Sequence, residues 1–446
     1  MARFLLAVWP FPSHYAPMLA IGRSLLERGH EVAFYSGDRA RTAMVEEGFT
    51  FFGFEAVDDN HVDDIMFSRN QYASWKGPLR VKALLRDWLL GTVPGQVKDL
   101  TRIIAAWHPD AILSETSMWA PMLVLHETEG LPVAVFSTVA ACLLPGPDAP
   151  PAGWGLPRPR SWSTRLVARA AGMATSALAF DFRRAIDEVR RGYGLGPLPT
   201  SFTEYTGRMP LYLVPTTPEF DYERRDLPAS VHYIGPCLWN AGKREAAPSW
   251  LDDLPRDRPW VHVTEGTMHT QEPILLRAAA KGLAGLPMQV IMTTGGRRDP
   301  ASLGLGPGAD NVRVEQWVAH QFLLPRTDLV VTTGGAGTVM TVLQAGVPLI
   351  VVPTEWDKPE NAQRVVEAGV GVRIQPRRLT PERLRAAVEQ VLGDPSYRRN
   401  AKRLAASFAE YHGPARAAEL LESLTCGPTA MPEIAGKGPY LEERMS

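Results

Sequence analysis

A glycine-rich turn follows an apolar run in the second half of the chain, in the stretch TDLVVTTGGAGTVMTVLQAGVP at 327–348. The pattern predicts a buried strand that ends in TTGGAG and a helix that opens at Thr338. Gly334, Gly335 and Gly337 would let the backbone approach a ligand closely, and the helix N-terminus favours an anion. The turn therefore predicts a phosphate site, although a tight turn without a ligand explains the glycines about as well.

Neither common phosphate motif is present in this turn. The sequence lacks GxxxxGK[ST], and the glycine spacing is not GxGxxG. A P-loop ATPase and a standard dinucleotide site are therefore poorly supported.

Alternating strands and helices must position this turn. The apolar run Phe4–Trp9 predicts a buried strand, a helical pattern that closes at Gly29 follows, and HEVAFYS predicts a second strand. Further strands are expected at HPDAILSE, LPVAVFST, WVHVTEGT, MQVIMTTGG, DLVVTTGG and VPLIVVPT. This repetition predicts an α/β protein with two doubly wound, Rossmann-like sheets.

Composition describes an ordinary globular protein. The chain has 446 residues, 45% of them hydrophobic, which favours about two domains. Lysine plus arginine (47) nearly balances aspartate plus glutamate (48), so we expect no nucleic-acid partner. Cys142, Cys237 and Cys426 form no CxxC pair, which argues against a zinc site and a disulfide framework and fits a cytoplasmic protein.

Breaks in the pattern predict the domain boundaries. Prolines and charges at 234–259 indicate an interdomain linker, and LLPGPDAPPAGWGLPRPRSW at 143–162 indicates either a mobile functional loop or disorder. We expect an N-terminal domain at 1–233, a C-terminal domain at 260–400, a helical region at 401–426 that packs back toward the N-terminal domain, and a polar tail at 427–446.

Several motifs in matching order resemble one family. They are PFPSHYAPM, GHEVAF, VTEGT, EQWVAHQFLLPRTDLVVTTGGAGT, AGVPLIVVPTEWDKPENAQRV and GVGVRI. With them the chain resembles the nucleotide-sugar-dependent glycosyltransferases of GT-B fold, especially bacterial enzymes that glycosylate natural products such as antibiotics. The resemblance implies an N-terminal acceptor-binding domain, a C-terminal donor-binding domain, reaction in the cleft between them, and inversion at the anomeric carbon.

The resemblance also implies donor-binding residues. Trp317 would stack on the nucleotide base and the Val318 backbone would reach the base edge, while a core tryptophan is the alternative for Trp317. Thr267, which could also be an ordinary loop residue, would help to bind the diphosphate. The remaining donor-site candidates are Thr333, Gly334, Gly335, Gly337, Thr338, Asp357 and Lys358.

The catalytic pair implied by the resemblance is His14 and Glu115. An imidazole titrates near neutrality and can take the proton of an acceptor hydroxyl. The family pairs this histidine with an aspartate, and the longer Glu115 can still orient the ring. A surface histidine and a surface glutamate are the alternatives.

Three positions depart from the family pattern. Thr333 stands where a histidine usually contacts the diphosphate, and threonine donates one hydrogen bond but carries no charge. Thr341 replaces a glutamate that binds the ribose hydroxyls, which fits a deoxyribose donor such as a TDP-sugar better than a UDP-sugar. Lys358 replaces a glutamine beside Asp357 and supplies only donors and a charge.

Aromatic residues suggest the acceptor. We expect Phe11, Met66, Trp75, Trp88 and Trp119 to line a pocket for a hydrophobic natural product, although core packing explains them equally well. The amphipathic stretch 163–191 could touch a membrane, but packing on its own domain is the simpler interpretation. We expect a monomer or homodimer and no membrane contact.

No cofactor is expected beyond the nucleotide sugar as co-substrate, and no metal, because the motifs offer no carboxylate cluster suited to magnesium. Two other functions stay open. A nucleotide-sugar epimerase would need acids in the donor site and no acceptor cavity, and a non-catalytic nucleotide-sugar-binding partner protein would need the catalytic pair displaced.

Overall fold

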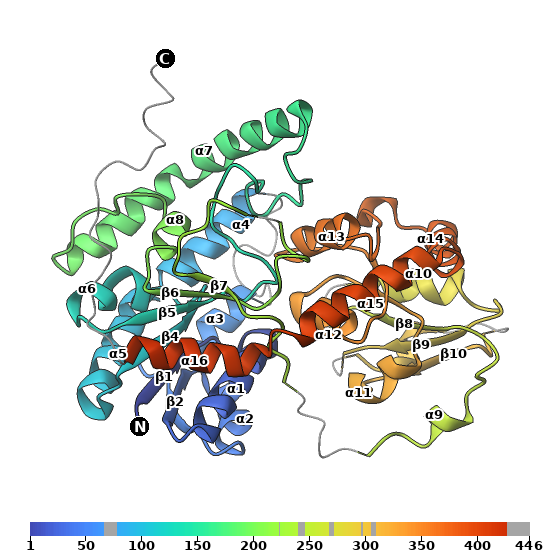
Figure 1. Ribbon diagram of the computed structural model, residues 1–446, viewed down its shortest axis with the longest axis horizontal. Coiled ribbons are helices and arrows are strands. Elements are labelled where there is room, and N and C mark those ends of the chain that lie inside the picture. The colour runs from blue at the N-terminus through green and yellow to red at the C-terminus, as the bar shows by residue number, and fades with distance from the viewer. Residues whose placement is uncertain are drawn as a thin grey trace.

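The computed structural model describes residues 1–66, 78–222, 224–239, 246–266, 272–295, 298–304 and 309–425. These residues form two lobes, each built on a parallel sheet (Figure 1). The α/β class with two Rossmann-like sheets, expected from the sequence, is confirmed.

The N-terminal sheet has seven strands in the order β3-β2-β1-β4-β5-β6-β7, and all neighbouring pairs run parallel. Its strands are β1 (Arg3–Ala7), β2 (Glu31–Ser36), β3 (Thr50–Gly53), β4 (Ala111–Glu115), β5 (Val133–Phe136), β6 (Leu211–Val214) and β7 (Val231–Tyr233). Its helices are α1 (Pro12–Glu27), α2 (Arg41–Val45), α3 (Asp59–Met66), α4 (Pro78–Leu85), α5 (Val93–Trp107), α6 (His126–Thr128), α7 (Trp162–Gly192) and α8 (Phe202–Thr206). Two π-helical turns, Arg86–Leu90 and Pro121–Leu125, join these helices.

The C-terminal sheet has six parallel strands in the order β10-β9-β8-β11-β12-β13. Its strands are β8 (Trp260–Thr264), β9 (Gln289–Thr293), β10 (Val312–Glu315), β11 (Leu329–Thr332), β12 (Leu349–Val351) and β13 (Gly371–Arg373). Its helices are α10 (Ile274–Gly282), α11 (His320–Leu323), α12 (Ala336–Gln344), α13 (Lys358–Glu367), α14 (Pro381–Gly393) and α15 (Pro395–Ala409).

Both sheets reverse their strand order at one point. In the N-terminal sheet β1 lies between β2 and β4, and in the C-terminal sheet β8 lies between β9 and β11. The segments that follow β1 and β4, helix α1 and the turn Pro121–Leu125, pack in different cores on opposite faces of their sheet. The same holds for α10 and α12, which follow β8 and β11. Such reversals leave a crevice at the carboxyl ends of the strands, where open α/β sheets bind ligands.

Every strand expected from the sequence is present, and five strands were missed. β3, β6, β7, β10 and β13 are only three or four residues long, which is too short for a clear strand pattern. No helix was expected at 234–259, but a short one, α9 (Trp250–Asp253), lies there. Its Leu251 is buried against the C-terminal domain, which stabilises the turn.

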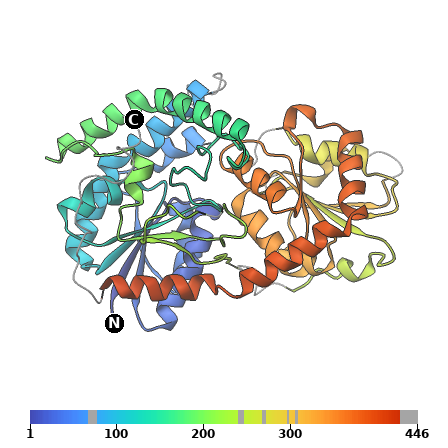
Figure 2. The ribbon, with the colours of Figure 1, turned by 45° about the horizontal axis from the view of Figure 1, so that its top comes forward.

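The C-terminal helical region consists of two helices. α15 ends at Ala409, and α16 (Gly413–Thr425) begins after His412, whose φ of 48° turns the chain. α16 runs under the N-terminal lobe beside α1 (Figures 1 and 2), where Glu422 binds Arg28 and His30 at 2.6 and 2.7 Å.

The proline-rich stretch 143–162 is packed against the other domain. The Gly155 N–H donates to Glu360 Oε1 at 2.7 Å, and Arg373 Nη1 donates to the Gly155 carbonyl at 2.8 Å. Nearby, Arg364 of α13 donates to the buried Asp221 at 2.8 Å. Because breaking a buried ion pair is costly, these contacts fix the relative position of the two domains.

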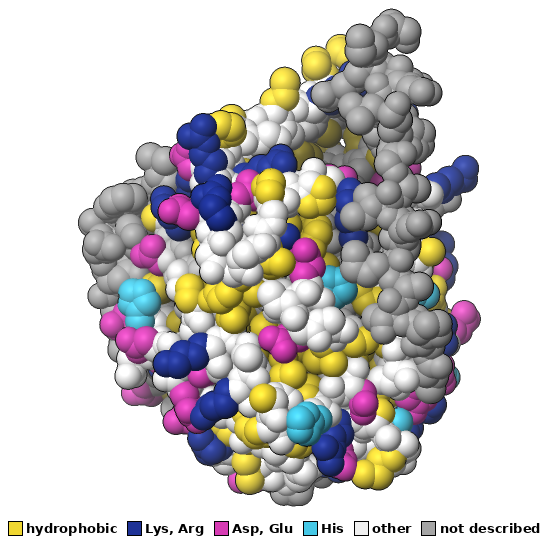
Figure 3. Space-filling model, turned by 90° about the vertical axis from the view of Figure 1, so that its left-hand side faces the viewer, with side chains coloured by type: hydrophobic (Ala, Val, Ile, Leu, Met, Phe, Trp, Pro, Cys, Tyr) yellow, Lys and Arg dark blue, Asp and Glu magenta, His cyan; other side chains and the backbone are white. Residues whose placement is uncertain are grey.

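Helix α7 packs on its domain through one face only. Ala171 and Ile186 are buried, as expected for a helix lying on its own domain, but Leu166, Met173 and Phe180 on the outer face are exposed. Hydrophobic side chains accordingly stand out at the top of the N-terminal lobe in Figure 3, where α7 lies.

Candidate active site

His14 and Glu115 meet at the point where the N-terminal sheet reverses. His14 lies in the first turn of α1, directly after β1, and Glu115 is the last residue of β4. His14 Nδ1 lies 2.9 Å from Glu115 Oε1. Glu115 is fully buried, so the surface alternative for this residue does not hold.

Backbone groups orient the Glu115 carboxylate. The Ser117 N–H donates to Oε2 at 2.9 Å, and the Trp9 N–H lies 3.5 Å from Oε1. A carboxylate held in this way favours the tautomer in which His14 Nδ1 carries the proton. His14 Nε2 is then the nitrogen that can accept a proton.

The glycine turn opens at the corresponding point of the C-terminal sheet. Gly334 has a φ of 91°, and a Cβ there would lie 2.5 Å from Val351 Cγ1, so only glycine fits. A Cβ at Gly335 or Gly337 would meet nothing within 4 Å. Helix α12 begins at Ala336, two residues earlier than expected, and its N-cap residue provides no side-chain hydrogen bond. The Asp357 carboxylate accepts from the Ala336 N–H, the first of the helix, so the N–H groups of Gly337 and Thr338 are the candidates for binding an anion.

Thr333 does not offer its hydroxyl to that space. The side chain is buried, and its hydroxyl donates to the Glu265 carbonyl at 3.0 Å. This bond ties the turn after β11 to the loop after β8. Any contact between Thr333 and a diphosphate would therefore come from its backbone N–H.

Asp357 and Lys358 begin helix α13 beside the turn. Asn361 donates to Asp357 Oδ2 at 2.7 Å and to the Gly334 carbonyl at 2.9 Å. Burial raises the pKa of the Asp357 carboxyl, and the Asn361 hydrogen bond opposes this shift. Burial lowers the pKa of the Lys358 ammonium, which donates to Thr354 at 2.9 Å.

Trp317 is not a core residue. Its side chain is 53% exposed, and its ring is stacked near that of His320 with 22° between their planes. The side chain of the next residue, Val318, is buried, which anchors the backbone beside Trp317. Thr338 is partly exposed in the first turn of α12, and Thr341 donates to the Gly337 carbonyl at 2.7 Å. Thr267 lies outside the described residues.

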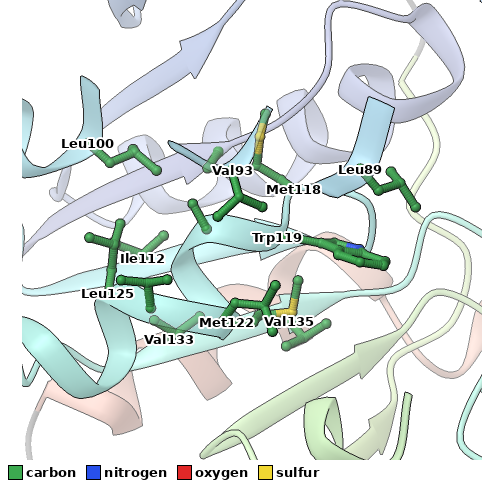
Figure 4. Close-up of a cluster of buried hydrophobic side chains, with 14 of the residues drawn as sticks. Leu89, Val93, Leu100, Ile112, Met118, Trp119, Met122, Leu125, Val133 and Val135 are labelled. Atoms are coloured by element: carbon green, nitrogen blue, oxygen red, sulfur yellow. The ribbon is translucent and has the colours of Figure 1, made fainter. Parts of the chain in front are cut away.

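The aromatic residues expected around the acceptor divide into two groups. Phe11 and Trp88 are buried beside His14: the ring of His14 lies 5.5 Å from that of Phe11 and 6.4 Å from that of Trp88. All three belong to one hydrophobic core, but the ring of Trp119 (Figure 4) packs on those of Phe182 and Phe202, 4.2 Å from the latter, and makes no such ring contact with His14 within the described residues.

For Trp119 the structure therefore favours core packing over acceptor binding, because both its ring and its indole N–H, which donates to the Thr116 carbonyl, are occupied internally. Trp75 and the side chain of Met66 lie outside the described residues.

Two residues that hold the donor turn were not singled out from the sequence. Asn361 joins the turn to α13, and the Glu265 carbonyl accepts a hydrogen bond from the Thr333 hydroxyl. Asn361 belongs to the PENAQ motif, which offered a signal. The role of Glu265 depends on a contact between two loops that are distant in the sequence, and no local pattern predicts such a contact.

Comparisons with known proteins agree with this geometry. Residues 282–424 match the family model "Erythromycin biosynthesis protein CIII-like, C-terminal domain". The chain is 34% identical over 428 residues to 4'-demethylrebeccamycin synthase of Lentzea aerocolonigenes, across 95% of this chain and 99% of the relative.

Solved structures share the fold. The calicheamicin glycosyltransferase CalG4 aligns with a TM-score of 0.71 and 21% identity, covering 96% of this chain and 100% of that chain. The Streptomyces sp. SF2575 glycosyltransferase SsfS6, complexed with thymidine diphosphate, aligns with a TM-score of 0.63 and 22% identity, covering 95% and 100%.

The chain thus belongs to the nucleotide-sugar-dependent glycosyltransferases of GT-B fold, and within them it is similar to bacterial antibiotic glycosyltransferases. No helix in the described part of the chain is long and apolar enough to cross a membrane. Over the same ranges no cluster of three or more His, Cys, Asp or Glu side chains could hold a metal ion.

Proposed function

We propose that this protein transfers a sugar from a nucleoside-diphosphate sugar to a hydroxyl of a hydrophobic natural product, with inversion at the anomeric carbon. The observation that carries the proposal is the hydrogen bond of 2.9 Å between the partly exposed His14 and the fully buried Glu115 at the sheet reversal. A surface histidine would not need a fully buried carboxylate held by backbone N–H groups.

His14 is the proposed general base. As the acceptor oxygen attacks the anomeric carbon, its proton passes to His14 Nε2, and Glu115 stabilises the imidazolium that forms. The new bond joins the acceptor oxygen to the anomeric carbon, and the bond from that carbon to the diphosphate oxygen breaks. Attack from the face opposite the leaving group gives inversion.

The α12 N-terminus is the proposed site of the diphosphate leaving group. The N–H groups of Gly337 and Thr338 and the helix dipole would stabilise the negative charge that develops on the departing oxygen. Since backbone groups can supply this stabilisation, the proposed transfer needs no metal ion. Asp357 would accept hydrogen bonds from the sugar hydroxyls.

A TDP-sugar is the favoured donor. Thr341 is too short to replace the glutamate that binds ribose hydroxyls in the family, and its hydroxyl already donates to the Gly337 carbonyl. A deoxyribose lacks the 2′-hydroxyl and needs no such partner. The complex of the structurally similar SsfS6 with thymidine diphosphate supports this choice.

The proposal is tested by incubating the purified protein with a TDP-sugar and a panel of phenolic and macrolide alcohols, followed by mass spectrometry. Acceptor mass increased by one sugar, with release of TDP, is the expected result. Donor isomerised without loss of acceptor would point to an epimerase, and unchanged donor and acceptors despite tight TDP binding would point to a partner protein.

A further inference from the structure

Trp356 adopts a backbone conformation that a bulky residue rarely accepts. Its φ is 63°, and it immediately precedes Asp357 at the start of α13. Among the described residues other than glycine, only His108 and His412 also have positive φ. His108 is the C-cap of α5, where a left-handed residue is usual, and His412 lies in the turn between α15 and α16. Trp356 ends no helix. Strain of this kind persists where the surroundings impose it and is concentrated at functional sites.

The indole of Trp356 reaches the opposite domain. Its ring centroid lies 6.2 Å from that of Trp88, with 82° between the planes. Trp88 is buried and also contacts Phe11 and His14. Trp356 thus joins the loop that carries Asp357 to the aromatic wall beside the proposed base.

Trp356 keeps a free surface in this position. Its side chain is 42% exposed, although Trp88 covers part of it. An exposed indole held in a strained conformation offers a flat apolar surface to a ligand at little further cost in conformational entropy.

Trp88 also has an unused hydrogen-bond donor. Within the described ranges its indole Nε1–H is buried and has no hydrogen-bond partner. Buried N–H groups are nearly always paired, and an indole in a wall of aromatic rings needs an oxygen from elsewhere. A bound ligand with an acceptor oxygen would supply it.

We propose that Trp356 determines acceptor specificity: together with Trp88 it forms a site for a planar, polycyclic phenol. The aromatic rings of the acceptor lie on the exposed surface of Trp356, and a ring oxygen or carbonyl accepts from Trp88 Nε1–H. The reacting hydroxyl faces His14. The inference rests on the proposed function, and it makes the donor domain part of the acceptor site.

The test compares binding of alizarin, a planar phenol, with binding of testosterone, a non-planar alcohol of similar size, by equilibrium dialysis. Trp356→Leu and Trp356→Gly are expected to weaken alizarin binding at least tenfold. TDP affinity, measured by calorimetry, should stay within twofold.

Trp88→Phe keeps an aromatic ring but removes the indole N–H, and should weaken alizarin binding several-fold. Trp162→Leu, at a position 80% exposed on α7, is the control and should change neither alizarin binding nor TDP affinity.

Thermal unfolding separates this role from a structural one. Glycine accepts positive φ without strain, so Trp356→Gly should unfold at the same temperature as the parent or a higher one. A clearly lower Tm, alizarin binding unchanged in both Trp356 variants, or a parent that binds testosterone as well as alizarin would overturn the inference. If alizarin binding depends on Trp356 but no sugar is transferred and TDP does not bind, the proposed function fails while the aromatic site stands.

Discussion

The sites at the sheet reversals of the two domains are built in different ways. On the N-terminal side a pair of side chains is already hydrogen-bonded, the partly exposed His14 to the fully buried Glu115. On the C-terminal side the polar side chains of Thr333 and Asn361 hold the turn, and Asp357 accepts from the Ala336 N–H. The groups proposed to meet the ligand there are the next backbone N–H groups of α12, at Gly337 and Thr338. On the proposed function, the acceptor side would present a specific base, whereas the donor side would present a backbone surface.

This difference predicts different consequences of substitution. Removing a side chain on the acceptor side should affect the chemical step and leave the fold intact. Removing a polar side chain that holds the donor turn should mainly reduce stability. A substitution in the proposed donor site should reduce nucleotide affinity only if the replaced residue contacts the nucleotide.

The largest effect is expected at His14. Since a positioned general base contributes about 10²–10⁴-fold, His14→Ala should lower kcat by roughly that factor. Single-turnover transfer from a TDP-sugar measures the loss, and TDP affinity should stay close to that of the parent. His61→Ala, at an exposed position on α3, is the matched control. Full activity in His14→Ala would remove the proposed base.

The next effect is expected at Trp317. If its exposed ring stacks on the nucleotide base, Trp317→Ala should weaken TDP binding by about 1–3 kcal/mol, since base–aromatic stacking has that magnitude. Trp317→Phe should retain much of the affinity, because a smaller ring can still stack. Calorimetry with equal affinities for all three proteins would show that Trp317 does not contact the base.

A loss of stability rather than affinity is expected at Thr333. Thr333→Val removes the donor to the Glu265 carbonyl, and leaving a buried group unpaired costs about 1–3 kcal/mol. Urea unfolding should show this loss in the free energy of unfolding, whereas TDP affinity measured below the transition should change little. A variant of parental stability that binds TDP many times more weakly would mean that the Thr333 hydroxyl contacts the diphosphate.

The smallest effect is expected from removal of metal ions. With backbone N–H groups at the leaving group, treatment with EDTA followed by gel filtration should leave the transfer rate unchanged. Adding magnesium back should have no effect either. A rate that falls after chelation and recovers with magnesium would place a metal ion at the diphosphate.

Much of this architecture could be predicted from the sequence, because buried parallel strands are continuous apolar runs and the glycine turn is a local pattern. Gly334 illustrates this, since the conformation that demands glycine depends on one turn. The pairing of His14 with Glu115 required the family resemblance, because the two residues are 101 positions apart.

Other features depend on contacts between residues that are distant in the sequence, which hydrophobic periodicity does not predict. The Thr333 hydroxyl was expected at the ligand, but its partner lies on a loop 68 positions away. Trp119 was expected at the acceptor, yet its apolar neighbours on α7 and α8 place it in the core. No sequence pattern predicted a role for Trp356, because its strained φ and its contact with Trp88 of the other domain exist only in the folded chain.

Titration of the parent and of Gly337→Ala with TDP, UDP and GDP by calorimetry tests most directly that the α12 N-terminus binds the donor diphosphate. A Cβ at Gly337 meets no protein atom within 4 Å, and alanine favours the helix by about 0.5–1 kcal/mol, so the variant should be at least as stable as the parent. We expect the parent to prefer TDP and the variant to bind it at least tenfold more weakly, because the added methyl group occupies the space of the diphosphate. Preference for UDP would contradict only the choice of donor. Equal TDP affinity in both proteins, or no binding of any nucleotide, would contradict the account of the donor site.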